Sequence, residues 1–255
     1  MAPHANDALA NYPLCSLRTV LKRFRPPAGA FAPAGPWEHV YGVYTLAGRS
    51  ATARRAGVLR LRRKPDDSQA RLDVRYEKAL TGGSQLVTAR LRGPGDSPLA
   101  TPTRWTFESL LRGPDQSAIP QTRRRRSAAV ADGTVTFADE TGREQLALAG
   151  AYTVGVSLFD AVQRFAPGAR AVPFTLIDHY DQLKGDCLLS PGKKMTVTVA
   201  GDKAIPTRTV EQFGRGNMPW VYWLDAAGRL LFVVAGLEAY VLEPARPTET
   251  PPSPE

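Results

Sequence analysis

The densest group of side chains that could carry chemistry lies in the segment IDHYDQLKGDC, residues 177–187. Asp178, His179 and Asp181 supply carboxylates and an imidazole, and Cys187 supplies a thiol at the end of the segment. A cysteine beside a histidine that an aspartate orients is a pattern of nucleophilic catalysis. Clustered carboxylates are the ligands that divalent cations such as Ca²⁺ prefer. The segment therefore raises a catalytic and a metal-binding interpretation.

Both interpretations meet objections in the local pattern. Cys187 and His179 are eight residues apart, with neither a glycine-framed turn nor a helix N-terminus between them to activate the thiol. The acidic residues do not have the spacing of an EF-hand loop, so we expect no metal site. Strand alternation would put Asp178 and Tyr180 on one face and His179 on the other. A hydrolase of polymers or esters, with Asp178, His179 and Asp181 as catalytic residues, is kept as an alternative.

Other motifs that would announce an enzyme are missing. The segment GRGNMP, residues 214–219, has two glycines of a dinucleotide fingerprint but lacks the third and the following helix. The sequence contains no P-loop and no G-x-S-x-G motif. Its three histidines and two cysteines do not have zinc-site spacing, and Cys15 lies in an expected tail, which argues against a disulfide with Cys187. We expect no cofactor.

Arginine is the second feature with chemical consequences. The formal net charge is +9, and residues 36–130 carry 18 Lys and Arg against 8 Asp and Glu, whereas residues 131–255 carry 11 against 15. Arginine favours planar, bidentate contacts with carboxylate or phosphate. The first half therefore predicts an anionic partner, such as a membrane surface, a nucleic acid or a polyanionic glycan. Arginine-rich composition is also typical of GC-rich genomes, so the charge alone does not establish a partner.

Two groups of arginines stand out within the basic half. One lies on a single face of the alternating segment 57–64, and the other is the run RRRR, which is typical of a solvated loop. The expected anion-binding residues are Arg60, Arg62, Arg123, Arg124, Arg125 and Arg126. We do not expect sequence-specific binding of nucleic acid.

The third feature is the aromatic segment WVYWLDAAGRLLFV, residues 220–233. In a strand, Trp220 and Tyr222 share one face while Trp223 lies on the other, so both faces are apolar. Such a strand is normally covered on both sides. We expect a helix to cover one face, and either a partner chain or the N-terminal arm with Phe24 and Phe31 to cover the other.

Alternation of apolar and polar residues with period two dominates the rest of the chain, for example in residues 57–64 and 70–80. This pattern predicts half-buried antiparallel strands. Two segments, 135–148 and 221–234, share the pattern apolar-x-Asp-x-x-Gly-Arg, which predicts hairpins whose aspartate caps the turn and whose glycine adopts positive φ.

One helix interrupts the strands near residues 157–166. Ser157 begins it, an apolar stripe of Phe159, Val162 and Phe165 follows, and Pro167 ends it. The predicted fold class is mainly β, with a strongly curved antiparallel sheet, a half-barrel or open barrel, wrapped around this one amphipathic helix. The expected domains are a Pro/Ala-rich N-terminal arm (1–36) with a short helix at 14–24, a single β-domain (37–243) and a disordered tail (244–255).

The sequence contains no targeting signal that would determine the cellular location. No run approaches the ~20 apolar residues that a membrane helix needs, and the first thirty residues lack the apolar core of a signal peptide. We expect a periplasmic or secreted protein if a signal was removed before Met1, and a cytoplasmic protein otherwise.

The strand–helix–strand order of residues 37–243 and the terminal hairpin PWVYWLDAAGRLLFV resemble the half-barrel fold of bacterial outer-membrane lipoprotein carriers and related periplasmic β-proteins. The resemblance is one of architecture and transfers no residue-level motif. It implies a bacterial envelope protein with an apolar concavity that receives a lipid or another hydrophobic group, unless the helix stripe fills that space.

Three functional hypotheses follow. The first is a non-enzymatic module that binds a hydrophobic or anionic ligand or partner, and the hydrolase is the second. The third is a polyanion-binding module that uses the arginine-rich first half to hold an anionic surface or glycan. The expected ligand-binding residues of the first hypothesis are Trp220, Tyr222, Trp223, Phe159 and Phe165.

Overall fold

The computed structural model describes residues 14–46, 53–215 and 218–244. The expected arm up to residue 13, His4 included, the tail from residue 245 on and two residues of GRGNMP lie outside this range. The first eight strands are β1 (Trp37–Leu46), β2 (Ala53–Asp66), β3 (Gln69–Leu80), β4 (Gly83–Pro94), β5 (Arg104–Arg112), β6 (Arg124–Ala131), β7 (Thr134–Asp139) and β8 (Gly142–Ala147). The others are β9 (Tyr152–Val154), β10 (Val172–Asp178), β11 (Gln182–Thr198), β12 (Ala204–Gly214), β13 (Trp220–Leu224), β14 (Leu230–Ala235) and β15 (Glu238–Leu242).

Helices are short throughout the described residues. The α-helices are α2 (Arg18–Leu21) and α3 (Leu158–Arg164), and 3-10 turns occur at η1 (Leu14–Leu17), η2 (Pro120–Thr122), η3 (Gly155–Ser157) and η4 (Ala200–Asp202). A helix of seven residues is too short to be stable alone, so packing must hold α3 in place.

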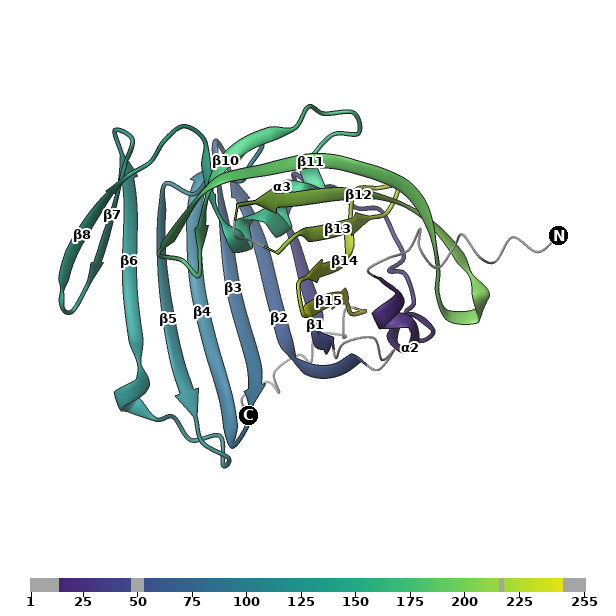
Figure 1. Ribbon diagram of the computed structural model, residues 1–255, viewed down its shortest axis with the longest axis horizontal. Coiled ribbons are helices and arrows are strands. Elements are labelled where there is room, and N and C mark those ends of the chain that lie inside the picture. Colours follow the sequence, from purple (N-terminus) through teal and green to yellow (C-terminus); the bar gives the residue numbers. More distant parts are fainter. Residues whose placement is uncertain (1–13, 47–52, 216–217, 245–255) are drawn as a thin grey trace, which may run out of the picture.

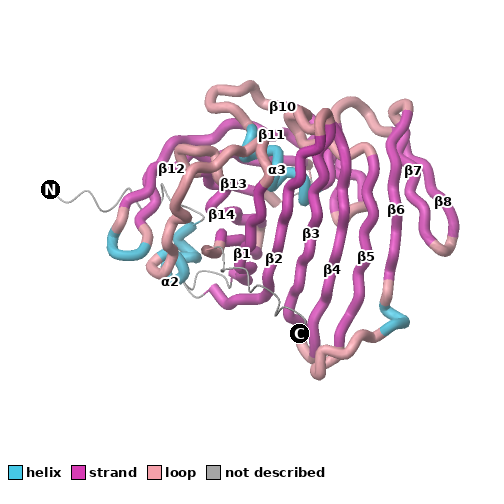
Figure 2. Tube along the Cα trace, turned by 180° about the vertical axis from the view of Figure 1, so that it is seen from behind, coloured by secondary structure: helices cyan, strands magenta, loops and turns pink. Residues whose placement is uncertain are grey.

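All fifteen strands belong to one sheet, in the order β8-β7-β6-β5-β4-β3-β2-β1-β15-β14-β13-β12-β11-β10-β9. Neighbouring strands are antiparallel except β9 and β10, which are parallel. The first and last strands, β1 and β15, pair at the middle of the sheet, so two arms extend from them, β1–β8 and β9–β15. The sheet is strongly curved, and the second arm crosses over one end of the broad wall that the first arm forms (Figures 1 and 2).

Hydrogen bonds and ring contacts hold the two arms face to face. The indole Nε1 of Trp105 donates to the carbonyl of Tyr180 at 2.9 Å, and the rings of Phe107 and Tyr180 stack at 5.1 Å. Farther along, the Thr101 hydroxyl donates to the carbonyl of Tyr152 at 3.0 Å. We call the face of the first arm that meets the second arm the inner face, and the opposite one the outer face.

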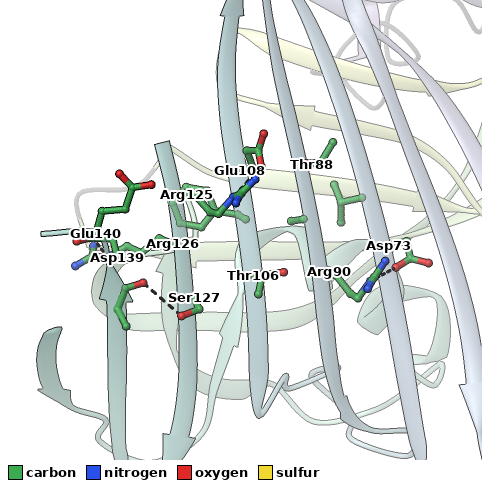
Figure 3. A pocket seen from close by; sticks show the side chains of 14 residues that line it. Asp73, Thr88, Arg90, Thr106, Glu108, Arg125, Arg126, Ser127, Asp139 and Glu140 are labelled. Carbon is green, nitrogen blue, oxygen red and sulfur yellow. Dashed lines mark hydrogen bonds and ion pairs between the residues drawn. The ribbon is translucent and has the colours of Figure 1, made fainter. Parts of the chain in front are cut away.

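The alternation predicted from sequence separates these two faces. In β2, Leu59 and Leu61 are buried on the inner face, whereas Arg60 and Arg62 are exposed on the outer face. The outer face of β3–β6 carries the charged side chains of Asp73, Arg90, Glu108 and Arg125, which Figure 3 labels.

The mainly β class and the strongly curved sheet are therefore confirmed. The helix α3 packs against the middle of the sheet, where the Phe159 ring meets the rings of Tyr41 at 5.5 Å, Tyr222 at 6.2 Å and Tyr240 at 5.3 Å. These partners lie on β1, β13 and β15, and the expectation that the whole sheet wraps around the helix is not confirmed.

The N-terminal arm covers the second face of the aromatic hairpin. Trp223 and Phe232 are paired in register on the face opposite Tyr222, and the Phe24 ring packs on Phe232 at 4.6 Å. The Arg229 guanidinium donates to the carbonyls of Pro27 at 3.1 Å and Gly29 at 3.0 Å, which fastens the arm. Residues 14–21 of the expected helix at 14–24 form η1 and α2. Four apolar side chains of the segment 14–24 are buried in the core: Leu14, Leu17, Leu21 and Phe24.

The turn of this hairpin follows the predicted chemistry. Gly228 has a φ of 82°, a conformation that glycine adopts without steric cost. The Asp225 carboxylate accepts from the backbone N–H of Ala227 at 2.9 Å and of Arg229 at 2.8 Å. A short polar side chain that satisfies the turn's own N–H groups is the reason for aspartate at this position.

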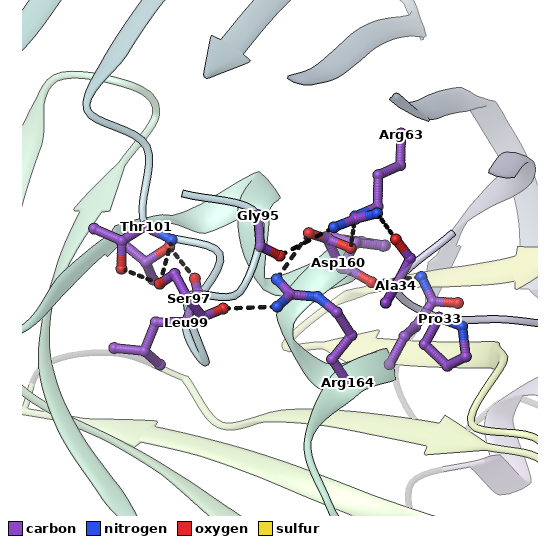
Figure 4. A network of polar contacts seen from close by, with 12 residues as sticks. Pro33, Ala34, Arg63, Gly95, Ser97, Leu99, Thr101, Asp160 and Arg164 are labelled. Carbon is purple, nitrogen blue, oxygen red and sulfur yellow. Dashed lines mark hydrogen bonds and ion pairs between the residues drawn. The ribbon is translucent and has the colours of Figure 1, made fainter. Parts of the chain in front are cut away.

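A buried cluster of three charges joins α3 to the first arm (Figure 4). The Asp160 carboxylate lies 3.1 Å from Nε of Arg63 and 3.0 Å from Arg164, which follows it by one helical turn. The side chains of Arg63 and Asp160 are only 2% and 6% exposed. Charges removed from water to this degree are stable only when they are paired and hydrogen-bonded.

Backbone carbonyls complete the cluster and connect it to two further segments. Arg63 donates to the carbonyls of Gly35 at 3.0 Å and Gly95 at 3.1 Å, and also to that of Ala34. Arg164 donates to the carbonyl of Ser97 at 2.8 Å. The two arginines that pair with Asp160 therefore connect four segments: the N-terminal arm, β2, the loop after β4 and α3.

We predict that Asp160→Asn lowers the free energy of unfolding by about 3–5 kcal/mol, because it leaves two buried guanidinium groups without a counter-charge. Urea denaturation followed by circular dichroism measures the change. The control is Glu77→Gln, which removes the partner of the exposed Arg75 and should cost less than about 1 kcal/mol. Equal losses in the two variants would contradict a structural role for the cluster.

His39 adds a pH dependence to stability. Burial lowers the pKa of His39 below its ordinary value of 6.5, and it outweighs the hydrogen bonds to Gln163 and Glu38 that raise it. The unfolded chain therefore binds a proton near pH 6.5 that the folded protein takes up only at lower pH, so stability falls as the pH drops through 6.5.

We predict that the free energy of unfolding falls between pH 7.5 and 5.5 in the wild type, and that His39→Gln reduces this fall. Denaturant titrations at the two pH values measure the difference. The control is His179→Gln, which removes a histidine whose side chain is 79% exposed and should leave the wild-type fall in place. The same fall in the His39 variant as in the wild type would remove this histidine as its cause.

Candidate functional site

A cavity of about 580 Å³ lies between the inner face of the first arm and the second arm; we call it the inner cavity. Its first wall is a row of side chains in register across β2 to β6, namely Leu59, Tyr76, Val87, Ser109 and Arg124. The side chains of this wall therefore change from apolar at β2 to cationic at β6.

The opposite wall is aromatic. Trp220 on β13 stacks on Tyr240 of β15 at 6.3 Å with an interplanar angle of 21°. The Phe159 ring from α3 stands edge-on to both, 6.5 Å from Trp220 and 5.3 Å from Tyr240. Three elements that are distant in sequence therefore present one aromatic surface to the cavity.

The hairpin between β10 and β11 closes one side of the cavity. His179 and Tyr180 both have positive φ, 47° and 72°, and the Asp181 N–H donates to the carbonyl of Asp178 at 3.2 Å. Two successive left-handed residues form the kind of tight turn that normally holds glycine or asparagine. The contacts of Tyr180 with Phe107 and Trp105 hold the turn, and because β10 ends at Asp178, strand alternation does not extend to His179.

Charged groups lie around the rim, each beside a group of opposite sign. Asp178 accepts from Lys184 at 2.6 Å and lies 3.8 Å from the His179 imidazole. Lys78 pairs with Glu238, whose carboxylate also accepts from the Tyr240 hydroxyl at 3.0 Å.

The cavity also contains protonated phenols. Burial raises the pKa of both Tyr76 and Tyr240 above the ordinary value of 10.0, and the Glu238 carboxylate adds to the effect. The Tyr76 hydroxyl is buried without a well-directed hydrogen-bond partner in the described residues.

The five ligand-binding residues predicted from sequence divide into two groups. Phe159 and Trp220 line the inner cavity. Tyr222, Trp223 and Phe165 are buried in the core, where the Tyr222 hydroxyl donates to Gln212 at 2.9 Å and the Trp223 indole to the Met195 sulfur at 3.0 Å.

The three residues of the hydrolase hypothesis, Asp178, His179 and Asp181, do not lie together at one site. Asp178 and His179 lie at the rim of the inner cavity, and the imidazole side chain is 79% exposed. Asp181 is buried and accepts from Arg124 at 2.6 Å and Arg126 at 3.1 Å. Among the described residues, no group of three or more His, Cys, Asp or Glu is placed to hold a metal ion. Catalysis by these residues stays a prediction.

The run RRRR is a strand start rather than a loop. Its last three residues open β6, so Arg124 and Arg126 face inward to Asp181, whereas Arg125 faces outward to Glu108 at 2.7 Å. Arg123 also lies beside Glu108, at 3.3 Å. Arg60 and Arg62 lie on the outer face, as expected from alternation, and Arg62 is 3.9 Å from Glu38. Anion binding by these six residues stays a prediction.

Sequence reasoning missed several residues of the inner cavity. Tyr76 and Phe107 lie at inward positions of alternating strands, and Tyr180 and Tyr240 come from segments that pair only in the folded sheet. The sequence did place aromatic residues at inward strand positions. It did not show which residues of the second arm they would face across the cavity.

Comparisons with known proteins leave the family open. No protein-family model matches the chain, and no curated protein matches it. One matching solved structure is the crystal structure of a DUF1089 family protein from Pseudomonas aeruginosa, 17% identical, with 84% of this chain and 97% of that chain covered and a TM-score of 0.38. No helix in the described part of the chain is long and apolar enough to cross a membrane. At this level of similarity, neither membership of that family nor a function follows.

Proposed function

We propose that this protein is a non-catalytic binding module that holds a small amphiphilic molecule in the inner cavity. The observation that carries the proposal is the aromatic wall of Phe159, Trp220 and Tyr240, which borders a cavity of about 580 Å³. Cavities of roughly 300–1,000 Å³ with apolar walls and a few polar groups are typical ligand sites.

The apolar part of the ligand would lie on the aromatic surface. Trp220 is half-buried, so a ligand would remove exposed indole from water, at a gain of about 25 cal/mol per Å² of apolar area. Val87 and Leu59 from the first wall would contact the opposite side of the same group. An acyl chain or a fused ring system has a shape that fits between two such walls.

The polar part of the ligand would lie at the Arg124 end. The Arg124 side chain is 57% exposed although it pairs with Asp181, so its guanidinium keeps donors free for an anionic group. Ser109, the register neighbour of Arg124 on β5, adds a hydroxyl at this end of the cavity. These donors favour a carboxylate, sulfate or phosphate head group over a cationic one.

We also propose that the protein resembles outer-membrane lipoprotein carriers in its mode of binding and that it is located in the bacterial envelope. A module that carries an apolar molecule between membranes needs an internal apolar site, which the inner cavity supplies. Cell fractionation of the native host with a periplasmic and a cytoplasmic marker tests the location; recovery only with the cytoplasmic marker would contradict it.

We predict that 1-anilinonaphthalene-8-sulfonate, an apolar anion, binds the native protein at the inner cavity, and that Val87→Trp raises its Kd at least tenfold by filling the space. Dye fluorescence titration measures the Kd. The matched control is Val58→Trp, the same substitution at a half-buried position on the outer face of β2, which should leave the Kd within about twofold.

A second variant separates loss of the site from loss of the fold. Trp220→Ala removes the indole without adding bulk, and it should also weaken dye binding while the near-ultraviolet circular dichroism of the other aromatic residues persists. Equal dye affinity in the wild type, Val87→Trp and Trp220→Ala would show that the dye binds elsewhere and would contradict the proposal.

A further inference from the structure

A row of four cations crosses the outer face of the first arm. Lys64 of β2 is in register with Arg71 of β3, Arg71 with Arg92 of β4, and Arg92 with Arg104 of β5. Like charges directly opposite on neighbouring strands destabilise a sheet. Because neighbouring strands are about 4.8 Å apart, the row extends over roughly 15 Å.

A groove of about 530 Å³ continues from the end of this row across β4 to β8; we call it the outer groove. Four arginines border it: Arg90, Arg92, Arg104 and Arg143. Its floor consists of short outward-facing side chains on β6 and β7: Ser127, Ala129, Thr136 and Ala138. No carboxylate is among the described residues that line it.

The neighbouring groove on the same face has a different charge balance. That groove, of about 740 Å³, is lined by Asp73, Glu108, Asp139 and Glu140 beside three arginines (Figure 3). The charge of the outer groove is therefore local to the β4–β8 end of the face and not a general property of an arginine-rich sheet.

The arginines of the outer groove are poorly neutralised. Arg90 pairs with Asp73 at 3.2 Å and Arg92 with Asp66 at 3.3 Å, and both arginine side chains are more than half exposed. Such exposed pairs contribute little, so a stronger anion can replace the carboxylate. Arg104 and Arg143 have no carboxylate within ion-pair distance in the part of the chain that the structure describes.

We propose that the outer groove binds a single chain of an acidic polysaccharide, with its carboxylate or sulfate groups on Arg104, Arg143 and the cation row. Repeated anionic groups along a polymer match a row of guanidinium and ammonium groups at strand spacing. Guanidinium groups bind planar and tetrahedral oxyanions through paired hydrogen bonds. This site lies on the opposite face from the inner cavity and does not depend on it.

Geometry favours this occupant over two other polyanions. A flat membrane surface cannot enter a groove, and the large exposed hydrophobic side chains of the described residues, Leu80, Leu188, Phe213, Met218 and Leu237, do not line it. Binding of single-stranded nucleic acid relies on aromatic side chains that stack with bases. The one aromatic residue at the outer groove, Trp105, is 2% exposed and cannot stack with a base.

The test measures binding of fluorescein-labelled heparin and polygalacturonate fragments to the full chain by fluorescence anisotropy at about 150 mM salt, where screening already weakens unspecific contacts. We expect binding of at least one of the two, and the pair identifies sulfate or carboxylate as the preferred group. The double variant Arg104→Ala with Arg143→Ala should weaken it at least tenfold. The matched control, Lys193→Ala with Lys194→Ala, removes two exposed charges from β11 and should change the affinity less than twofold.

Three results would overturn the proposal. The first is no binding of either glycan by the wild type. The second is an equal loss in both double variants, because net charge rather than the outer groove would then hold the polymer. The third is equal or tighter binding of a deoxythymidine 20-mer or of phosphatidylglycerol vesicles, which would assign the arginines to nucleic acid or to a membrane.

Discussion

The fold depends on the burial of Asp160 between two arginines. The carboxylate faces Arg63 from β2 and Arg164 from its own helix, and the two guanidinium groups extend to carbonyls of the N-terminal arm and of the loop after β4. Burying a carboxylate and two cations costs desolvation free energy, and separating the carboxylate from the cations leaves buried charges unpaired. The cluster therefore favours the observed position of α3 on the sheet, in addition to the packing of its apolar side chains.

The position of α3 in turn determines the inner cavity. Phe159 precedes Asp160 and faces the cavity, and Gln163, one turn later, accepts from the backbone N–H of Leu230 at 3.2 Å and meets His39 at 3.1 Å. The helix is thus held on β1 and β14 at the same time. Movement of α3 would separate Phe159 from Trp220 and Tyr240, so the contacts that hold α3 also hold Phe159 at the cavity.

The local part of this structure could be predicted from sequence, because it depends on periodicity and turn chemistry. The alternation of β2 placed Arg60 and Arg62 outside, and the Asp225–Gly228 pattern predicted a turn that the structure contains. The aromatic residues of the inner cavity could be suspected one at a time. Their meeting could not be predicted, since Phe159, Trp220 and Tyr76 come together only through sheet order.

Two features contradict local signals for identifiable reasons. His179 and Tyr180 both adopt positive φ, which is unusual for a bulky residue such as tyrosine, and the Tyr180 ring stacks on Phe107 of the other arm. The arginine run starts a strand because alternate members find carboxylates on different faces, Asp181 inside and Glu108 outside. In both cases a contact between distant segments outweighs the preference of the segment itself.

The same rule separates the charges of the two faces. Inward arginines such as Arg124 and Arg126 meet Asp181, a carboxylate that the second arm supplies. No second arm lies over the outer face, so Arg104 and Arg143 have no such partner among the described residues. Outward arginines rely instead on carboxylates of their own arm, as Arg125 does on Glu108 and Arg90 on Asp73, and Arg104 and Arg143 lack one in the described part of the chain. Since successive residues of one strand alternate between the faces, substitutions in β4 or β5 can alter either site without touching the other.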